Sequence, residues 1–145
     1  MPAKSLHTLI RLRKWEVDEK QRALGLLIRE EEGVLDRQRQ LEDGLVRERQ
    51  VTSAADPMLR STFEPFVRRC MQRREELDRM LFDVRKRVAA AQAELADAYR
   101  RLKTFEITQK ARDVATEKEE NRLEQIGLDE MGLTLHRRRA SGAAL

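Results

Sequence analysis

The chain has 145 residues, of which 39% are charged and 4% aromatic, with only six Gly and three Pro. This composition is typical of long helices and coiled coils and excludes a compact α/β enzyme. No stretch approaches the ~18 apolar residues of a membrane span, and the first residues lead into no secretory signal pattern. We therefore expect a cytoplasmic, soluble and non-globular protein.

The charges argue against a nucleic-acid partner, although 30 basic and 26 acidic residues leave a net charge of +4. The two signs are interleaved along the chain, as in Arg29-Glu30-Glu31-Glu32. Interleaving is typical of a solvated helix surface with ion pairs between near neighbours. A phosphate-binding surface would instead gather its Lys and Arg on one face.

A first helix is predicted from about residue 5 to 51. Apolar residues recur there at alternating steps of three and four, the coiled-coil period, and we call this series the first seam: Leu6, Ile10, Val17, Leu24, Leu27, Val34, Leu41 and Leu45. Other positions of the series are polar, namely Arg13, Lys20, Glu31, Gln38 and Glu48. We therefore expect weak layers at these positions. Gly25, Gly33 and Gly44 lie off the seam, where each costs about 1 kcal/mol relative to Ala.

A second helix is predicted from about residue 63 to 133, after a loop over 52–62 that contains Pro57. Pro65 lies close to its expected start, and Gly132 suits a C-cap, which leaves a flexible tail over 134–145. The helix carries a second seam of the same period: Phe63, Val67, Cys70, Arg74, Leu77, Leu81, Val84, Val88, Ala91, Leu95, Ala98, Leu102 and Phe105. The series turns polar at Gln109.

The two seams predict an all-α fold in which two long helices form an antiparallel coiled-coil hairpin, a single domain over 1–145. A register that sets Val34 opposite Leu81 also sets Val17 opposite Ala98 and Ile10 opposite Phe105. Its midpoint falls in the predicted loop. Leu6 then lies opposite Gln109, so the first helix ends where the second seam becomes polar. The second helix should therefore extend beyond the first as an overhang.

No catalytic, metal or cofactor site is predicted. Gly127 and Gly132 have the spacing of a phosphate-binding loop, but the Lys that would follow is missing. His7 and His136 have no partner at metal-ligand spacing, and a lone Cys70 excludes an internal disulfide and is best explained as a small buried seam residue. A rod offers its carboxylates no pocket for acid–base catalysis. We expect neither an enzyme nor a protein with a small-molecule substrate.

Three features predict contacts with other proteins. Trp15, beside Arg11 and Arg13, suits an interface anchor, although packing on a neighbouring helix turn explains it equally well. Arginines gather near the tip of the hairpin and suit an acidic partner or merely a solvated surface: Arg37, Arg39, Arg47, Arg49, Arg68, Arg69, Arg73 and Arg74. The overhang keeps apolar residues that the first helix cannot cover: Leu123, Ile126, Leu128, Met131 and Leu133.

Three stretches of the chain resemble the FliJ family, the soluble, stalk-like component of the flagellar type III export apparatus. They are Leu-His-Thr-Leu-Ile-Arg-Leu-Arg-Lys-Trp-Glu-Val-Asp-Glu at 6–19, Lys-Thr-Phe-Glu-Ile-Thr-Gln-Lys at 103–110 and Glu-Gln-Ile-Gly-Leu-Asp-Glu at 124–130. The size and the two-helix layout also match along almost the whole chain. Stalk proteins of injectisome secretion systems are similar too, and a general coiled-coil scaffold acting as a homodimer is a further alternative.

The resemblance implies a non-enzymatic role in flagellum biogenesis and motility. A stalk in the central hole of the hexameric export ATPase ring would promote ring assembly and regulate the ATPase. It would also link the ring to the membrane export gate protein, act with export chaperones, and be peripheral at the inner membrane. By analogy, the end with both termini would contact the ATPase through Arg11, Arg13, Trp15, Leu123, Ile126 and Met131. The tip half would contact the gate through Leu41, Leu45, Arg73 and Leu77.

Overall fold

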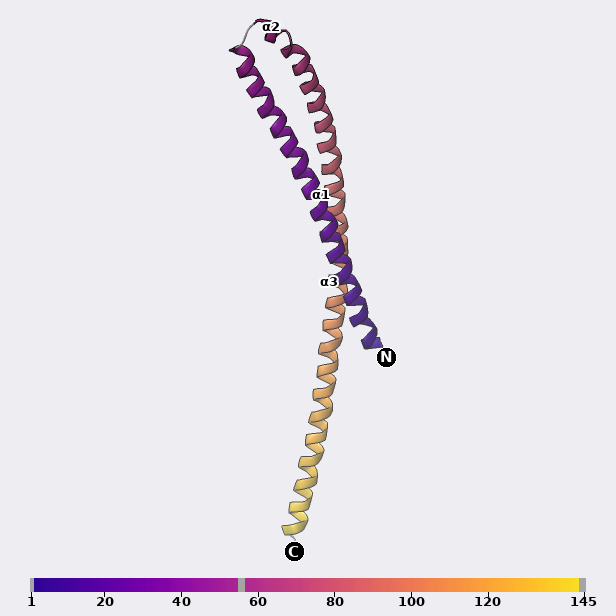
Figure 1. Cartoon of the computed structure of the whole chain (residues 1–145). Coiled ribbons are helices and arrows are strands. Elements are labelled where there is room, and N and C mark those ends of the chain that lie inside the picture. The colour runs from indigo at the N-terminus through magenta and orange to yellow at the C-terminus, as the bar shows by residue number, and fades with distance from the viewer. Residues whose placement is uncertain (1, 55–56, 144–145) are drawn as a thin grey trace. The chain divides into compact units, whose positions relative to one another are not determined.

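The computed structural model contains two long helices and one short one, α1 (Pro2–Ser53), α2 (Pro57–Arg60) and α3 (Phe63–Ala143) (Figure 1). It describes residues 2–54 and 57–143, with the backbone alone for 2–5, 59–60 and 143. These residues contain no strand, which confirms the all-α prediction. The chain divides into a hairpin unit, Trp15–Tyr99, and a terminal unit, Met1–Lys14 with Arg100–Leu145. The single domain over 1–145 stays a prediction.

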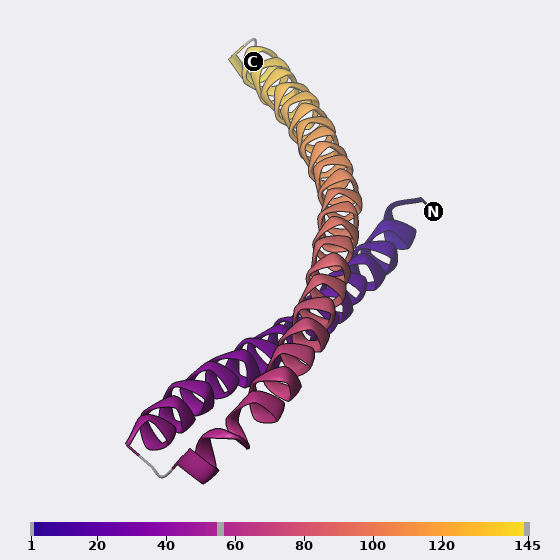
Figure 2. The same cartoon turned by 90° about the horizontal axis from the view of Figure 1, so that it is seen from above.

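The hairpin unit has the expected antiparallel arrangement. Its α1 and α3 segments run in opposite directions and lie side by side in both views, and α2 lies at the turn between them (Figures 1 and 2). The short helix α2 occupies part of the predicted loop and begins at Pro57, whose fixed φ suits the first position of a helix. Pro65 is the third residue of α3, where a missing amide hydrogen breaks no bond within the helix.

The predicted helix ends were wrong by a few residues at α1 and by a larger margin at α3. α1 begins at Pro2 and ends at Ser53, whose Oγ donates a hydrogen bond to the carbonyl of Gln50 at 2.9 Å. α3 continues through Gly132 to Ala143, so Gly132 is no C-cap and residues 134–143 are helical. One Gly costs only about 1 kcal/mol in a helix, and no Pro follows it to stop the next turns. The flexibility expected of 134–145 is untested, and residues 144–145 lie outside the described residues.

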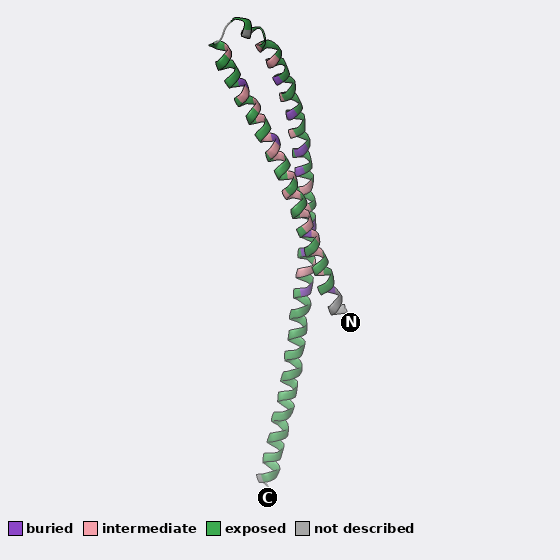
Figure 3. Cartoon of the chain, viewed as in Figure 1, coloured by how far each residue is buried: buried purple, intermediate pink, exposed green. Residues whose placement is uncertain are grey.

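The burial pattern of α3 confirms the second seam. Within the hairpin unit, every seam position from Phe63 to Ala98 is buried or half-buried. The residues between them are exposed except Phe66, whose ring stacks on Phe63 with centroids 6.4 Å apart. In Figure 3 the buried and half-buried residues lie where the two helices face each other. Two-helix packing at the coiled-coil period therefore forms the core.

Polar bonds between α1 and α3 support the expected register. Lys20 Nζ lies 2.8 Å from Glu94 Oε2, and Gln38 Nε2 donates to Asp78 Oδ1 at 2.8 Å. Three more ion pairs connect α1 to α3: Glu30 with Arg87, Glu31 with Arg85, and Glu42 with Arg74. Each pair lies within two residues of the register that sets Val34 opposite Leu81.

Apolar residues opposite two of the polar seam positions are fully buried. The register sets Glu31 opposite Val84 and Gln38 opposite Leu77, yet Val84 and Leu77 are only 0% and 1% exposed. Long polar side chains can cover apolar surface with their methylene groups while their polar ends stay hydrated. Glu31 bonds to Arg85 and Gln38 bonds to Asp78. Each partner directly follows the buried apolar residue, so the polar ends of Glu31 and Gln38 lie at the edge of the seam. The weaker contribution of these layers to stability stays a prediction.

The terminal unit shows where the pairing ends. Leu6 and Leu102 are buried, Ile10 and Phe105 are half-buried, and the Arg13 guanidinium carbon lies 5.4 Å from the centroid of the Phe105 ring. Gln109 is 6% exposed, and every described residue from 110 to 142 is exposed. The second seam thus loses its burial after Gln109, the position at which the register predicted that the first helix ends.

The glycines of α1 predict a simple route to a more stable hairpin. A Cβ built on Gly25, Gly33 or Gly44 meets no atom within 4 Å. Replacing all three by Ala should therefore raise the free energy of unfolding by about 0.5–1 kcal/mol per site, measured by urea titration of the circular dichroism signal. The reverse change at an exposed position, Ala23→Gly, should lower it. If the triple variant were no more stable than wild type, the inference that a methyl group fits at these positions would be contradicted.

A charge in the seam should disrupt the hairpin. Leu81 is half-buried opposite the buried Val34, whereas its neighbour Phe82 is 67% exposed. Leu81→Asp should lower the free energy of unfolding by at least about 2 kcal/mol, because a carboxylate would lose hydration. Phe82→Asp should lower the free energy of unfolding much less. Thermal melts of the two variants followed at 222 nm compare them, and equal melting temperatures would contradict the register.

The Lys20–Glu94 pair predicts a dependence of stability on pH. The hydrogen bond from Lys20, with its positive charge, lowers the pKa of Glu94 below the ordinary value of 4.5. The pair therefore stabilises the hairpin above pH 4.5, and this contribution disappears as the pH falls through the lowered pKa. Both side chains are exposed, so the contribution is small.

Glu94→Gln isolates that contribution. The difference in free energy of unfolding between wild type and variant should be present at neutral pH and shrink below the pKa of Glu94. Urea titrations at several pH values, repeated in high salt, measure it. A difference that grows in acid would contradict the assignment.

Candidate functional site

The residues considered for phosphate, metal or thiol chemistry all lie within the two long helices. Gly127 and Gly132 lie inside α3 rather than in a loop, so the backbone between them cannot wrap around a phosphate. The described residues contain no cluster of His, Cys, Asp and Glu suited to a metal ion. Cys70 is buried in the seam with a free thiol, as expected, while His7 and His136 are exposed. The exposed surfaces of the helices are the other candidates predicted from the sequence.

The largest candidate surface is the overhang, which we define as residues 110–142 of α3. All of its residues are exposed (Figure 3), and its large apolar side chains are between 42% and 63% exposed: Val114, Leu123, Ile126, Leu128, Met131, Leu133 and Leu135. Five of them were predicted from the sequence. Val114 was missed, and Leu135 was missed because the helix end was placed at 133. This much apolar surface on one segment is typical of a contact site.

The apolar residues of the overhang occupy two faces of the helix. At 3.6 residues per turn, Leu123, Ile126 and Leu133 project to one side. Leu128, Met131 and Leu135 project to another side, and the mean directions of the two groups lie nearly half a turn apart. The first face continues the second seam, and the second face lies outside it. The overhang can therefore contact two surfaces at once.

Polar side chains of the overhang pair along the helix. Arg122 donates to both carboxylate oxygens of Glu119, at 3.0 and 2.6 Å, which lowers the pKa of Glu119 and raises the pKa of Arg122. Gln125 Nε2 donates to Asp129 Oδ1 at 3.0 Å. Such pairs three or four residues apart stabilise a helix that has no neighbour.

The N-terminal candidates differ in exposure. In the terminal unit, Arg11 is exposed, whereas Arg13 is half-buried against Phe105. Arg13 thus contributes to the seam, and only part of it remains for a partner. In the hairpin unit, Trp15 is 59% exposed, which favours an interface anchor over packing on a neighbouring helix turn.

Of the four gate-contact candidates in the hairpin unit, two are buried. Leu45 and Leu77 are 6% and 1% exposed, Leu41 is half-buried, and only Arg73 is exposed. The four were chosen by their place along the hairpin, and three of them are seam positions that face the other helix. In the folded hairpin, Leu45 and Leu77 are therefore unavailable to a partner.

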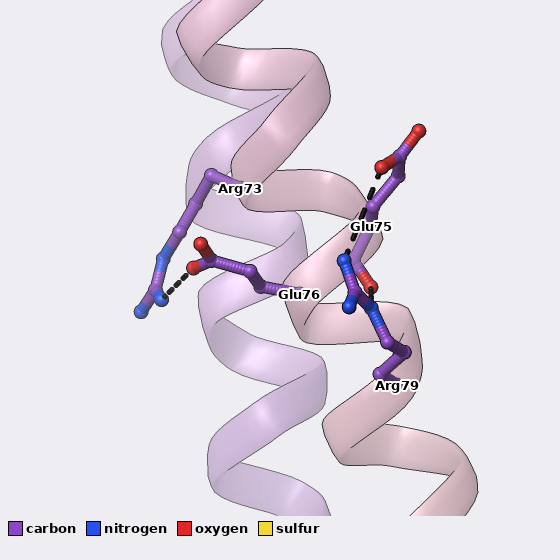
Figure 4. Close-up of polar contacts among 4 residues, drawn as sticks. All are labelled: Arg73, Glu75, Glu76 and Arg79. Carbon is purple, nitrogen blue, oxygen red and sulfur yellow. Dashed lines mark hydrogen bonds and ion pairs between the residues drawn. The ribbon is translucent and has the colours of Figure 1, made fainter.

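Arg73 lies in an exposed, charged stretch of α3. Its Nη1 donates to Glu76 Oε2 at 3.0 Å, and on a different side of the helix Arg79 Nε donates to the carbonyl of Glu75 at 3.4 Å (Figure 4). These bonds lie within α3, unlike those that connect α3 to α1. Sequence reasoning missed the inter-helical pairs, because spacing along one chain does not show which charges meet across a seam.

Comparisons with known proteins identify the family. The family model for the flagellar FliJ protein matches residues 2–141. A search of curated proteins found no match, and a search of solved structures found none either. None of the helices in the described part of the chain is long and apolar enough to cross a membrane. Because the family model covers nearly the whole chain, this protein belongs to the FliJ family and is a component of flagellar type III export that works with protein partners of the export apparatus.

Proposed function

We propose that this protein is a non-enzymatic stalk of the flagellar export apparatus. In this proposal it inserts into the hexameric export ATPase ring, links the ring to the membrane export gate and binds export chaperones. The family match supports the flagellar system over an injectisome. The single observation that carries the proposal is the overhang, in which a helix without a neighbour holds large, exposed apolar side chains.

The overhang and the exposed N-terminal residues form the proposed contact with the ATPase ring. Leu123, Ile126 and Met131 are 55%, 42% and 63% exposed. Apolar anchors of this size dominate the affinity of protein interfaces when a partner buries them. The exposed Arg11 and Trp15 add a charged and an aromatic contact, whereas Arg13 acts mainly through its packing on Phe105.

The proposed gate contact involves the outer surface of the hairpin near Arg73. Arg73 and the half-buried Leu41 are accessible to the gate protein. Leu45 and Leu77 contribute indirectly in this proposal, because their burial in the seam holds the two helices together. Changes at Leu45 or Leu77 would therefore weaken the gate contact by loosening the hairpin.

The second apolar face of the overhang suits an export chaperone. Leu128 and Leu135 lie on this face and are exposed. A helix can contact different proteins through two faces, in turn or together. The proposed mechanism is mechanical: an elongated helix in a ring senses the ring's conformations, and its partners rather than its own residues carry out the chemistry.

The experiment that tests the proposal removes the apolar anchors. In the full chain, Leu123, Ile126 and Met131 are changed together to Glu, and the variant is titrated into the purified export ATPase. Wild type should stimulate ATP hydrolysis. The triple variant should need at least about tenfold more protein for the same stimulation, since each lost apolar anchor costs more than about 1 kcal/mol.

A matched control places the same three charges on exposed positions without large apolar side chains. Ala111, Ala115 and Asn121 are exposed in the same helix, and their combined change to Glu should preserve stimulation. Full stimulation by the anchor variant would contradict the proposed contact, and ATP hydrolysis by the protein alone would contradict the non-enzymatic role. Light scattering of the free protein tests the alternative of a homodimeric scaffold.

A further inference from the structure

The net charge of the chain comes from one region around the turn of the hairpin. Residues 45–74 contain seven Arg and three acidic residues, which gives this region a net charge of +4. The remaining 23 basic residues of the chain are matched by 23 acidic residues. The interleaving of charges that holds elsewhere therefore fails at the turn, where a positive potential results.

Several of these arginines are free to bind an anion. Arg68 pairs with Glu64 at 4.0 Å, and Arg73 and Arg74 also have carboxylate partners. By contrast, no carboxylate of a described residue pairs with the exposed Arg47, Arg49 or Arg69; Arg47 only donates from Nε to the carbonyl of Asp43 at 3.4 Å. The register of the hairpin sets Arg47 close to Arg69 across the two helices.

Apolar side chains accompany these arginines. Met58, in α2, is 82% exposed and is the most exposed of the large apolar residues described. Val51, near the end of α1, is 62% exposed. We call Arg47, Arg49, Arg69, Val51 and Met58 the basic tip. It combines guanidinium groups that pair with no carboxylate of a described residue with apolar side chains near the turn.

We propose that the basic tip adsorbs to an anionic lipid membrane surface. Arginines in such a cluster attract the phosphates of acidic headgroups, and the exposed apolar side chains near them enter the headgroup region. An exposed Met without arginines would not select a lipid surface, and arginines alone would accept any anion. Their combination at a turn favours a membrane.

An acidic protein segment is the less favoured occupant. A stable protein interface buries about 800 Å² per partner with close shape complementarity. A helical turn is narrow and convex and offers little area for such a fit. A lipid surface needs no fixed shape, because headgroups move to meet the protruding side chains. The proposal does not depend on the ATPase contact of the overhang, which lies in the other unit.

Vesicle co-sedimentation of the full chain tests the proposal. The probes are vesicles of phosphatidylcholine with about 30% phosphatidylglycerol, and vesicles of phosphatidylcholine alone, in about 50 mM and about 500 mM NaCl. We expect binding to the anionic vesicles that weakens in high salt. Changing Arg47, Arg49 and Arg69 to Gln should weaken binding at least about tenfold, and Met58→Ser should weaken it further.

The control removes three arginines elsewhere. Arg29, Arg101 and Arg112 are exposed, so their change to Gln gives the same net charge without altering the basic tip. This variant should bind nearly as well as wild type, and circular dichroism should show equal helicity in both. The proposal would be overturned if the control variant lost as much vesicle binding as the tip variant, or if wild type did not bind anionic vesicles. Capture on immobilised polyglutamate without vesicle binding would assign the tip to an acidic protein instead.

Discussion

The structure depends on a single apolar seam between two antiparallel helices. The seam repeats every 3.5 residues, and no second layer of core lies behind it in the hairpin unit. Each buried residue therefore packs on the facing helix alone, and the hairpin holds together through many small contributions. Val84 and Leu77 are the most completely buried of these residues. A fold of this kind leaves most of the described side chains exposed.

This constraint explains why the functional surfaces lie outside the seam. The pairing ends at Gln109, so the following residues of α3 present apolar side chains that no part of the described chain covers. Around the turn, arginines outnumber acidic residues by seven to three over residues 45–74. The seam thus organises two different surfaces, one apolar and helical, the other basic and convex. Membership of the FliJ family gives both surfaces a context of protein export.

The polar seam positions show how an imperfect repeat is tolerated. Lys20, Glu31 and Gln38 would be costly if their polar ends were buried without partners. Each bonds instead to a polar side chain on α3 beside the apolar residue opposite it. Their methylene groups remain available to cover the seam. Polar positions therefore define the register without opening the core.

The sequence by itself determined the helical class, the break near Pro57, the two seams and the residue at which pairing ends. These follow from local spacing, because a 3.5-residue repeat places its members on one face of a helix whatever the partner. Only the tertiary structure decided how far α3 continues past Gly132, since the cost of one Gly is too small to end a helix unless capping interactions add to it. It also decided which charges pair across the helices and that Leu45 and Leu77 are hidden from partners. Those properties depend on which side chains meet in space, and a single chain's spacing does not contain that information.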